Sequence, residues 1–425
     1  MKKLTKKVIA ARLARRVEKL LSSKKITVIT VTGSVGKTSA KSAIGKLLST
    51  KHQVRFSEDS YNTDIGLPLS FFGLKAPSPL WDPMAWRRVF QKISNISKHY
   101  PYDVVVLEMA DDEVEDMTTL LKVIKPDIGV ITAVAPVHME RMLNMDKVVR
   151  DNWKIASAAK KVVYNADYNH LRKLATKGKS SIGFGLQYGN VKFENVTRNK
   201  DGYLKATLVM PAGKTEVTTK MIGEQNLGSL LAAAAVAESL GMNPKDIASA
   251  IGKISGVNGR MNLLKGVNGS KIIDDSYNSS PEAVKAALKV ATDLPAKRRI
   301  AVLGNMNELG AESKTLHYEV GKEAAGSCDM LIIIGRDAEV HMVAGAKESG
   351  MDPDNIKVFK TPYEIGHFLK RIVKKGDLVL VKGSQNGVFV EEVSRILLDP
   401  ALNPAEHLVR QSTTWKKRKR KSFGL

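Results

Sequence analysis

The sequence is poor in cysteine and in long apolar runs. Cys328 is the only cysteine among the 425 residues, which excludes a disulfide framework and a zinc site built from several cysteines. No apolar run approaches the roughly eighteen residues that a membrane-spanning helix needs. The basic N-terminus also lacks the apolar core and the small-residue cleavage site of a signal peptide. These absences indicate a protein of a reducing compartment, and we expect it to be cytoplasmic.

Acidic residues are scarce relative to basic ones, and the imbalance is concentrated at the two ends of the chain. The formal net charge is +24, and residues 1–25 and 406–421 contribute seventeen basic and two acidic residues to it. We therefore expect most of the excess charge to lie outside the folded body, where it can hold the protein against an anionic membrane surface. Aromatic residues do not alternate with these lysines as in RNA-binding modules, so we expect no specific nucleic acid partner.

Runs that are typical of buried strands alternate with helical spacing over most of the chain. Such runs begin at residues 26, 102, 127 and 160, and again at 269, 297, 329 and 377. The pattern predicts an α/β protein, with a central P-loop ATPase-type domain of mostly parallel sheet followed by a smaller Rossmann-like C-terminal domain. Residues 181–221 alternate around a turn and predict an antiparallel hairpin. The predicted domains are a basic amphipathic helix at 1–25, the central domain at 26–258, the C-terminal domain at 259–398 and a basic tail at 399–425.

A glycine-rich loop between a predicted strand and a predicted helix is the strongest local signal. Its residues are Gly33, Ser34, Val35, Gly36, Lys37, Thr38 and Ser39. Glycines let backbone N–H groups approach phosphate oxygens, Lys37 neutralises the β- and γ-phosphates, and Thr38 offers a hydroxyl to Mg²⁺. The loop has two residues between its glycines where the usual pattern has four. The alternative is a chance turn, but the flanking strand and helix favour a phosphate-binding loop.

Two residues near strand ends are candidate magnesium ligands. Glu108 ends the apolar run 104–108, and carboxylates at the C-terminal ends of parallel strands face the ligand crevice. Together with Thr38 it would supply the oxygen donors that Mg²⁺ prefers. His138 follows the next strand and is a second candidate ligand. The alternatives are an ordinary acid at a strand end and a capped or surface histidine.

A series of segments in a fixed order resembles the Mur ligase family. The segments are TGSVGKTS (32–39), NTDIGLPLS (62–70), LEMA (107–110), PVHME (136–140), GEQNLGSLLAAAAV (223–236), GR (259–260), DDSYNSSPEAV (274–284), LGNMNELG (303–310) and VKGS (381–384). The resemblance covers roughly residues 26–395, and DDSYNSSP and LGNMNELG are its most specific parts.

The resemblance implies an ATP- and Mg²⁺-dependent ligase of cell-wall precursor synthesis. Such an enzyme activates a peptide carboxylate as an acyl phosphate and joins it to the amine of an amino acid or of D-alanyl-D-alanine, releasing ADP and phosphate. Its partners would be a peptide-bearing precursor and an amino acid or dipeptide, and we expect a monomer.

The resemblance also assigns residues. The catalytic residues would be Lys37, Glu108 and His138, with Thr38, Glu108 and His138 on the metal. Besides the phosphate loop, ATP would be bound by Asn226 near adenine, Arg260 near the phosphates and Asp275. The substrate-binding residues would be Asn62, Thr63, Tyr277 and Asn278. The simpler alternatives are a helix cap for Asn226, a solvated side chain for Arg260, a turn residue for Asp275 and core packing for Tyr277.

The sequence departs from the family pattern at several positions. The family's carbamylated lysine falls at Asn152, with Lys154 two residues on, and an amide cannot become a carbamate. Gln225 replaces a histidine, Ser229 an asparagine, Asn305 an aspartate and Gln385 an arginine. Only a basic helix precedes the phosphate loop, where the larger members of the family have a uridine-nucleotide-binding domain.

These departures leave two alternatives beside the cell-wall ligase. One is a related ligase that acts on a substrate without UDP, of the polyglutamate, cyanophycin or folate type. The other is a non-catalytic protein that binds nucleotides or nucleic acids, which the basic ends and Asn152 would suit.

Overall fold

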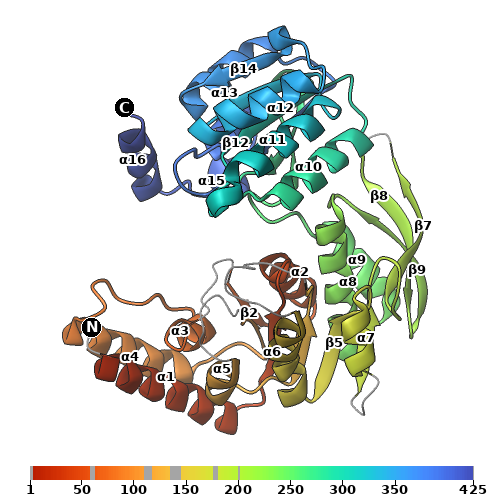
Figure 1. Cartoon of the computed structure of the whole chain (residues 1–425). Helices are drawn as coiled ribbons and strands as arrows, with labels where there is room; N and C mark the ends of the chain where they lie inside the picture. Colours follow the sequence, from red (N-terminus) through yellow and green to blue (C-terminus); the bar gives the residue numbers. More distant parts are fainter. Residues whose placement is uncertain are drawn as a thin grey trace. The chain divides into compact units, whose positions relative to one another are not determined.

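The chain folds into two compact units, shown in a computed structural model that describes residues 3–57, 63–109, 117–134, 145–175, 180–199 and 202–424 (Figure 1). Unit 1 comprises Met1–Thr197, Lys205–Thr219 and Glu224–Ile254, and unit 2 comprises Arg198–Leu204, Lys220–Gly223 and Ser255–Leu425. The main division follows Ile254, whereas the sequence places the domain boundary after residue 258.

Unit 1 is built on a six-stranded parallel sheet in the order β2-β3-β1-β4-β5-β6. The strands are β1 (Thr27–Thr32), β2 (Val54–Phe56), β3 (Val104–Glu108), β4 (Ile128–Ile131), β5 (Lys161–Asn165) and β6 (Ser181–Phe184). Strand β1 lies between β3 and β4, and almost all of its residues are buried. Such β-branched, two-sided burial is typical of a strand in the middle of a parallel sheet.

Helices cover this sheet, and a separate small sheet follows it. The helices are α1 (Lys3–Ser23), α2 (Lys37–Leu48), α3 (Gly66–Phe72), α4 (Pro83–Lys98), α5 (Met117–Val123), α6 (Met145–Ala158), α7 (Asn169–Ala175), α8 (Glu224–Ser239) and α9 (Pro244–Lys253). The small sheet contains β7 (Lys192–Arg198), β8 (Leu204–Met210) and β9 (Gly213–Thr219) in that order. The alanine-rich α8 packs along α2, because small side chains let two helices approach closely.

Helix α1 packs on unit 1 through an apolar stripe. Ile9, Leu13, Val17 and Leu20 are buried in a core that α1 shares with α3, α4 and β3. The basic side chains between them are mostly exposed, so the N-terminal charges lie on the surface of unit 1. Among the described residues, no helix combines the length and the apolar character needed to cross a bilayer.

Unit 2 is built on a second six-stranded sheet in the order β10-β11-β15-β12-β13-β14. The strands are β10 (Asn262–Lys265), β11 (Lys271–Asp275), β12 (Arg298–Gly304), β13 (Met330–Ile334), β14 (Ile356–Phe359) and β15 (Asp377–Lys382). Only β10, at one edge, runs antiparallel to its neighbour. The helices are α10 (Pro281–Asp293), α11 (Ser313–Ala325), α12 (Val343–Glu348), α13 (Pro362–Ile372), α14 (Glu391–Leu397), α15 (Pro404–His407) and α16 (Thr413–Ser422).

The C-terminal basic residues are part of unit 2, which corrects the expectation that they lie outside the folded body. The side chain of Lys419 on α16 has no exposed surface, and its Nζ lies 2.9 Å from Glu391 and 2.7 Å from Glu392. The rings of Trp415, on the same helix, and of Phe423, just after its last residue, both contact Phe389. A lysine can be buried here because two carboxylates neutralise it, a compensation that composition alone does not reveal.

The predicted fold class is confirmed, and the structure adds detail that the pattern did not contain. Residues 181–184, predicted to belong to a hairpin, form the sixth parallel strand of unit 1 by pairing with β5. The hairpin region proper is the three-stranded sheet of β7, β8 and β9. Strand β2 has only three residues, too few for a period to be recognised in the sequence.

Candidate functional site

The phosphate loop joins the end of β1 to the start of α2, and its glycines are required by geometry. Gly33 has a φ of 135°, and a Cβ there would collide with the Thr132 hydroxyl and lie 2.8 Å from the carbonyl oxygen of Ala133. Gly36 has a φ of 86° and is the N-cap residue of α2. Both positions therefore need a residue without a side chain.

The end of β4 holds this loop in place. The Thr132 hydroxyl donates to the carbonyl oxygen of Val35 at 2.7 Å, and the Ser34 N–H donates to that of Ala133 at 2.7 Å. The sequence did not point to Thr132 or Ala133, because neither resembles a ligand-binding residue.

Lys37 begins α2 and lies against the loop it is expected to serve. Its Nζ donates to the carbonyl oxygen of Gly33 at 2.6 Å. The positive end of the α2 dipole and the lysine charge thus act at the same place, an arrangement that favours an anion such as a phosphate group.

Thr38, in the first turn of α2, and Glu108, the last residue of β3, lie together. The Thr38 hydroxyl donates to Glu108 Oε2 at 3.1 Å, and Glu108 is 5% exposed. Lys41, one turn further along α2, places its Nζ 3.1 Å from the same oxygen and is itself 2% exposed. The sequence analysis missed Lys41, although its position three residues after Thr38 puts it on the same side of the helix.

The Thr38–Glu108 pair fits a magnesium ion in its donor chemistry. A hydroxyl and a carboxylate are hard oxygen donors, and Mg²⁺ commonly uses few protein ligands together with water and phosphate oxygens. In the described ranges, no three His, Cys, Asp or Glu residues are grouped in a way that could hold a metal. His138, the second predicted ligand, lies outside the described residues, as does Asn62.

Asn152 lies on α6, and its side chain is buried against the end of β1. Its Oδ1 accepts from the Thr32 hydroxyl at 2.8 Å, and its Nδ2 donates to the carbonyl oxygen of Val148 at 2.9 Å. Lys154, in contrast, is partly exposed and its Nζ lies 2.9 Å from Asp151. The amide at this position therefore ties α6 to β1, a contact that a lysine could not make in the same way.

Two further predicted residues of unit 1 lie at or just before the starts of helices. Asn226 is 3% exposed and lies within α8, two positions after its first residue, rather than at the N-cap. The hydroxyl of Thr63 accepts from the Gly66 N–H at 2.9 Å at the start of α3. Thr63 is exposed, so its remaining surface is accessible to a substrate.

In unit 2, two aspartates at the end of β11 organise the neighbouring loop. Asp275 accepts from the Met261 N–H at 3.0 Å and pairs with Lys382 Nζ at 2.6 Å. Asp274 has no exposed surface and accepts from the Gly259 N–H at 3.0 Å and from the Ser394 hydroxyl at 2.8 Å. Burial raises the pKa of Asp274 to about 6. Both carboxylates thus fix the backbone around Arg260.

Arg260 and Tyr277 are brought together by these contacts. The Arg260 guanidinium lies over the Tyr277 ring, 4.2 Å from its centroid, and the Tyr277 N–H donates to the carbonyl oxygen of Gly259 at 3.0 Å. Asn278 is exposed, and its carbonyl oxygen accepts from Lys382 at 3.0 Å. Asn305 accepts from the Ala338 N–H at 3.0 Å, so its amide oxygen serves a backbone contact.

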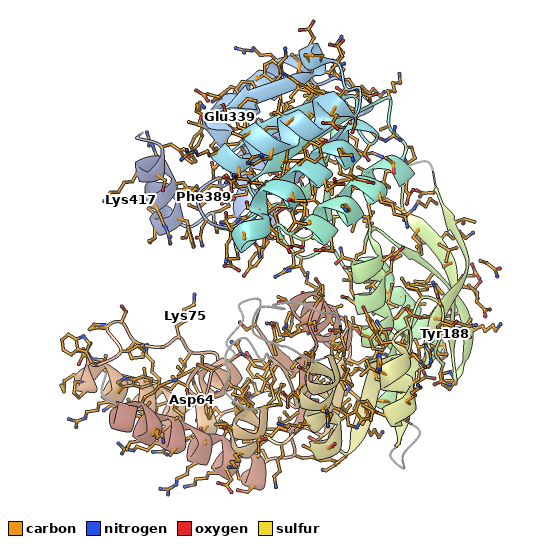
Figure 2. The ribbon with its side chains drawn as sticks, in the orientation of Figure 1. Asp64, Lys75, Tyr188, Glu339, Phe389 and Lys417 are labelled. Atoms are coloured by element: carbon orange, nitrogen blue, oxygen red, sulfur yellow. The ribbon has the colours of Figure 1, made fainter. Side chains whose placement is uncertain are left out.

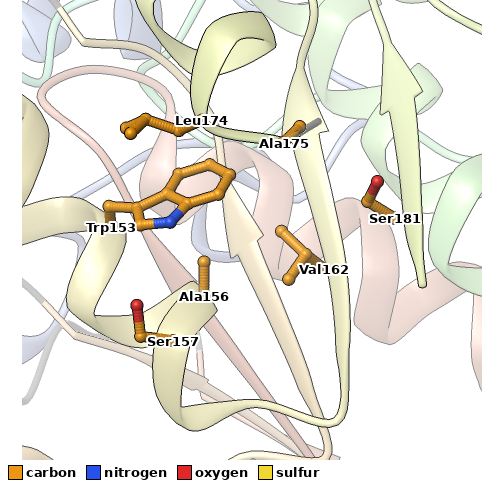
Figure 3. A pocket seen from close by; sticks show the side chains of 7 residues that line it. All are labelled: Trp153, Ala156, Ser157, Val162, Leu174, Ala175 and Ser181. Carbon is orange, nitrogen blue, oxygen red and sulfur yellow. The ribbon is translucent and has the colours of Figure 1, made fainter. Parts of the chain in front are cut away.

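A hollow in unit 1 lies apart from the predicted site residues. Figure 3 shows it between α6, α7 and the strands β5 and β6. It is lined by Trp153, Ala156, Ser157, Val162, Leu174, Ala175 and Ser181. None of these residues is a candidate site residue, and their mostly apolar side chains offer no anchor for a phosphate.

The sequence matches two family models in succession. The model described as Mur ligase middle domain matches residues 82–237, and the model described as Mur ligase, glutamate ligase domain matches residues 259–385. The chain is 24% identical over 381 residues to the UDP-N-acetylmuramoyl-tripeptide–D-alanyl-D-alanine ligase of Bacillus subtilis, covering 88% of this chain and 77% of that protein. For the Escherichia coli protein of the same name, the identity is 26%, and 87% of this chain and 76% of the relative are covered.

Solved structures show the same relationship. The MurF ligase from Thermotoga maritima in complex with ADP is 26% identical, with a TM-score of 0.72 over 91% of this chain and 83% of that one. MurF from Acinetobacter baumannii has a TM-score of 0.75 at 22% identity, over 91% of this chain and 79% of the other, which shows the fold.

Replacing Lys37 by alanine should abolish ATP turnover. The substitution removes the positive charge at the phosphate loop, and we expect kcat/KM for ATP to fall by roughly a hundredfold or more. Phosphate release is the measurement, and thermal unfolding checks that the variant folds. Turnover at the wild-type rate in the folded variant would mean that this loop is not the catalytic site.

Replacing Glu108 by glutamine should raise the Mg²⁺ concentration needed for half-maximal activity by roughly ten- to a hundredfold. The variant keeps the shape of the side chain but loses its charge, and Lys41 then faces a neutral amide. Magnesium titrations at saturating ATP measure the effect, with thermal unfolding as the check on folding. Glu216→Gln, a change at an exposed acid of unit 1, is the matched control. An unchanged titration for Glu108→Gln would remove Glu108 from the metal site.

Replacing Asp274 by asparagine should flatten the pH dependence of stability between about pH 4 and 6. The folded carboxyl, with a pKa of about 6 against 3.8 for an ordinary aspartate, binds its proton more tightly than the unfolded one. The wild-type free energy of unfolding should therefore fall as pH rises through this interval, by on the order of 3 kcal/mol. Chemical unfolding at several pH values measures it, and exposed Asp293→Asn is the control. An equally steep loss in Asp274→Asn would refute the assignment.

Proposed function

The chain belongs to the Mur ligase family, and we infer that it is an ATP-dependent ligase that forms an amide bond in cell-wall precursor synthesis. The observation that supports this is the match of both domains to the family together with a phosphate loop at which Lys37 contacts the Gly33 carbonyl and Thr38 contacts Glu108. The relatives are named as ligases, and the chain covers about three quarters of their length.

The reaction needs a leaving group, because a carboxylate cannot expel oxide. A carboxylate oxygen of the peptide attacks the γ-phosphorus of ATP, the bond from that phosphorus to the β-γ bridging oxygen breaks, and ADP departs. The incoming amine then attacks the carbonyl carbon of the acyl phosphate, phosphate leaves with the bonding electrons, and the nitrogen loses a proton. Lys37 and the N-terminus of α2 stabilise the negative charge that develops on the transferred phosphoryl group.

Magnesium fits the same place, and Thr38 and Glu108 are the described residues that would hold it. When bound there, the ion would neutralise charge on the phosphate oxygens. Lys41 compensates Glu108 from the side of α2 and so keeps a buried carboxylate from repelling the nucleotide. Arg260, Asp275 and Asn226 are proposed as further ATP-binding residues, and Thr63, Tyr277 and Asn278 as substrate-binding residues.

The finer proposal concerns the substrates. The relatives are named for UDP-N-acetylmuramoyl-tripeptide and D-alanyl-D-alanine, and we propose that this enzyme joins a muramoyl tripeptide to that dipeptide. Whether UDP is attached to the acceptor is a separate question, which the choice of substrates in the test addresses.

Phosphate release from ATP should require both a muramoyl tripeptide and D-alanyl-D-alanine. The tripeptide is supplied with and without UDP, and L-alanyl-L-alanine replaces the dipeptide as the control. Folyl and glutamyl acceptors represent the related ligases, and Lys37→Ala gives the blank. A product peak by mass spectrometry, heavier than the acceptor by the mass of the dipeptide less one water, completes the assay. Turnover only with the folyl or glutamyl acceptors would overturn the cell-wall assignment.

A peripheral contact with an anionic membrane is the proposed setting of the enzyme, and α4 and α1 would make it. Leu80, Trp81 and Met84, at and just before the start of α4, are 46%, 70% and 58% exposed. Such exposed apolar side chains in one short stretch are unusual on a protein surface and favour an interaction site. Tryptophan in particular is enriched where a protein meets the headgroup region of a bilayer.

Basic residues continue this surface along α4. Arg87 and Arg88 lie three and four residues after Met84 and are exposed, whereas Trp86 and Val89 are buried. Helix α1 lies beside α4 (Figure 1), and its Arg12 guanidinium lies over the Phe90 ring, 5.3 Å from the centroid. Both helices thus present cations outward beside an apolar edge, the pattern of a helix that rests on an anionic bilayer.

Vesicle sedimentation tests this contact. The wild-type protein should bind phosphatidylglycerol vesicles at low salt and bind fewer of them at high salt. It should not bind phosphatidylcholine vesicles. Arg87→Glu with Arg88→Glu should reduce binding strongly, since each cation near the surface contributes about 1 kcal/mol. Lys347→Glu with Lys370→Glu makes the same charge change on α12 and α13, outside both basic ends, and is the control.

A second variant tests the apolar edge. Replacing Leu80, Trp81 and Met84 by serine should remove the binding that persists at high salt. Equal sedimentation of wild type and both variants would refute the membrane contact. If the wild type co-purifies with RNA and the double variant Arg87→Glu/Arg88→Glu does not, the surface binds a polyanion instead.

A further inference from the structure

The last part of the chain contacts the loops that carry the proposed ATP-binding residues of unit 2. We call residues 403–424, which include α15 and α16, the C-terminal segment. It lies beyond residue 385, where the match to the family model ends. In Figure 2, Phe389 lies on the side of α16 that faces the body of unit 2, and Lys417 lies on the opposite side. The segment is therefore docked through one face.

Arg410 is the centre of this docking. Its Nε lies 2.8 Å from Glu391 Oε1 and its Nη2 lies 3.0 Å from Oε2, so the two groups pair through two parallel contacts. The same guanidinium donates to the carbonyl oxygen of Ser276 at 2.7 Å and to that of Tyr277 at 3.3 Å. One side chain thus ties the C-terminal segment to the backbone of the loop after β11.

The backbone at this contact is strained. Arg410 has a φ of 57°, and Phe389, which contacts the rings of α16, has a φ of 45°. Side chains other than glycine rarely adopt this conformation, and it persists only where surrounding contacts enforce it. An arginine held in this way is placed by the fold rather than by its own preference.

The C-terminal segment also contacts the loop that carries Arg260. Asn258 Nδ2 donates to the carbonyl oxygen of Glu406 at 3.0 Å. A Cβ on Gly259 would lie 3.0 Å from Val409 Cγ1, so the Val409 side chain packs closely against the backbone of Gly259. Residues 406–410 therefore bind the loop before β10 and the loop after β11 at the same time.

Tyr277 connects these contacts to Arg260. The Arg260 guanidinium lies 4.2 Å from the centroid of the Tyr277 ring, and the Arg410 guanidinium lies 5.8 Å from it. Arg410 holds the carbonyl of Tyr277, and the ring of Tyr277 supports Arg260 by a cation–π contact. A displaced Tyr277 would leave Arg260 without that support.

We propose that Arg410 is a positioning residue for the nucleotide, acting through Tyr277 on Arg260. The inference rests on the proposed function, because it takes Arg260 as an ATP-binding residue. The C-terminal segment is then an added part of the ATP site. It holds the loops of unit 2 in position before the nucleotide binds.

The test compares nucleotide binding in three variants. Arg410→Ala should raise the dissociation constant for ADP and the KM for ATP by roughly tenfold or more, because displacing a binding group by about 1 Å has effects of this size or larger. Arg410→Lys should lie between, since it keeps a charge opposite Glu391 but cannot span the carboxylate and both carbonyls. Lys417→Ala, on the exposed side of α16, should behave as the wild type.

Three readouts separate positioning from mere support of the fold. Calorimetry gives the ADP affinity, steady-state kinetics gives KM separately for ATP and for the peptide, and thermal unfolding gives stability. Positioning predicts a higher KM for ATP with an unchanged KM for the peptide. An unchanged ADP affinity in folded Arg410→Ala overturns the proposal. The proposal is also overturned if ADP affinity and the KM values for ATP and for the peptide all worsen by the same factor as stability falls.

Two less disruptive variants allow the proposal to be tested even if Arg410→Ala does not fold. Asn258→Ala and Val409→Ala remove contacts of the C-terminal segment without exposing a buried charge, and both should weaken ADP binding in the folded protein. Wild-type affinity in both would contradict the proposal. A wild-type protein that binds no ADP would instead overturn the proposed function itself, so the two failures are distinguishable.

Discussion

The interaction on which both units depend is a buried ion pair between a carboxylate at a strand end and a lysine. Glu108, the last residue of β3, faces Lys41, and Asp275, the last residue of β11, faces Lys382. Removing two charges from water is costly, and the attraction offsets this cost only when the geometry is good and the remaining oxygens are satisfied. Each carboxylate does accept a second bond, from a hydroxyl or from a backbone N–H. The carboxylates are therefore fixed at the C-terminal ends of β3 and β11.

This arrangement matters for a protein whose ligand is an anion. An uncompensated carboxylate beside a phosphate loop would repel ATP, whereas a carboxylate paired with Lys41 is nearly neutral to its surroundings. The pair still leaves the hydroxyl of Thr38 and the oxygens of Glu108 adjacent, and these are the oxygen donors proposed for a divalent ion. Lys37 and the dipole of α2 then act on the phosphates without an opposing charge.

Sequence reasoning succeeded where the determinants are local. The run of residues 27–32 is buried on both faces of a parallel sheet, and Gly33 and Gly36 follow because a tight loop needs positive φ there; all three features lie within ten residues. The end of a parallel strand is also a local feature, which is why the position of Glu108 could be predicted. Thr132 and Lys382 were missed because their roles depend on strands that pair only in the folded protein.

The basic ends show most clearly what composition cannot reveal. Trp415 and Lys419 are spaced by four residues and therefore lie on one face of α16, and Phe423 follows four residues later at the C-cap, so two aromatic residues flank the lysine that becomes buried. That spacing was the available signal, but it does not identify Glu391 and Glu392 as the partners. The charges of α1, by contrast, have no such flanking pattern on their side of the helix and stay in contact with water. The need of Glu391 and Glu392 for a cation thus draws Lys419 inward, while the other basic side chains of α16 and most of those on α1 stay exposed.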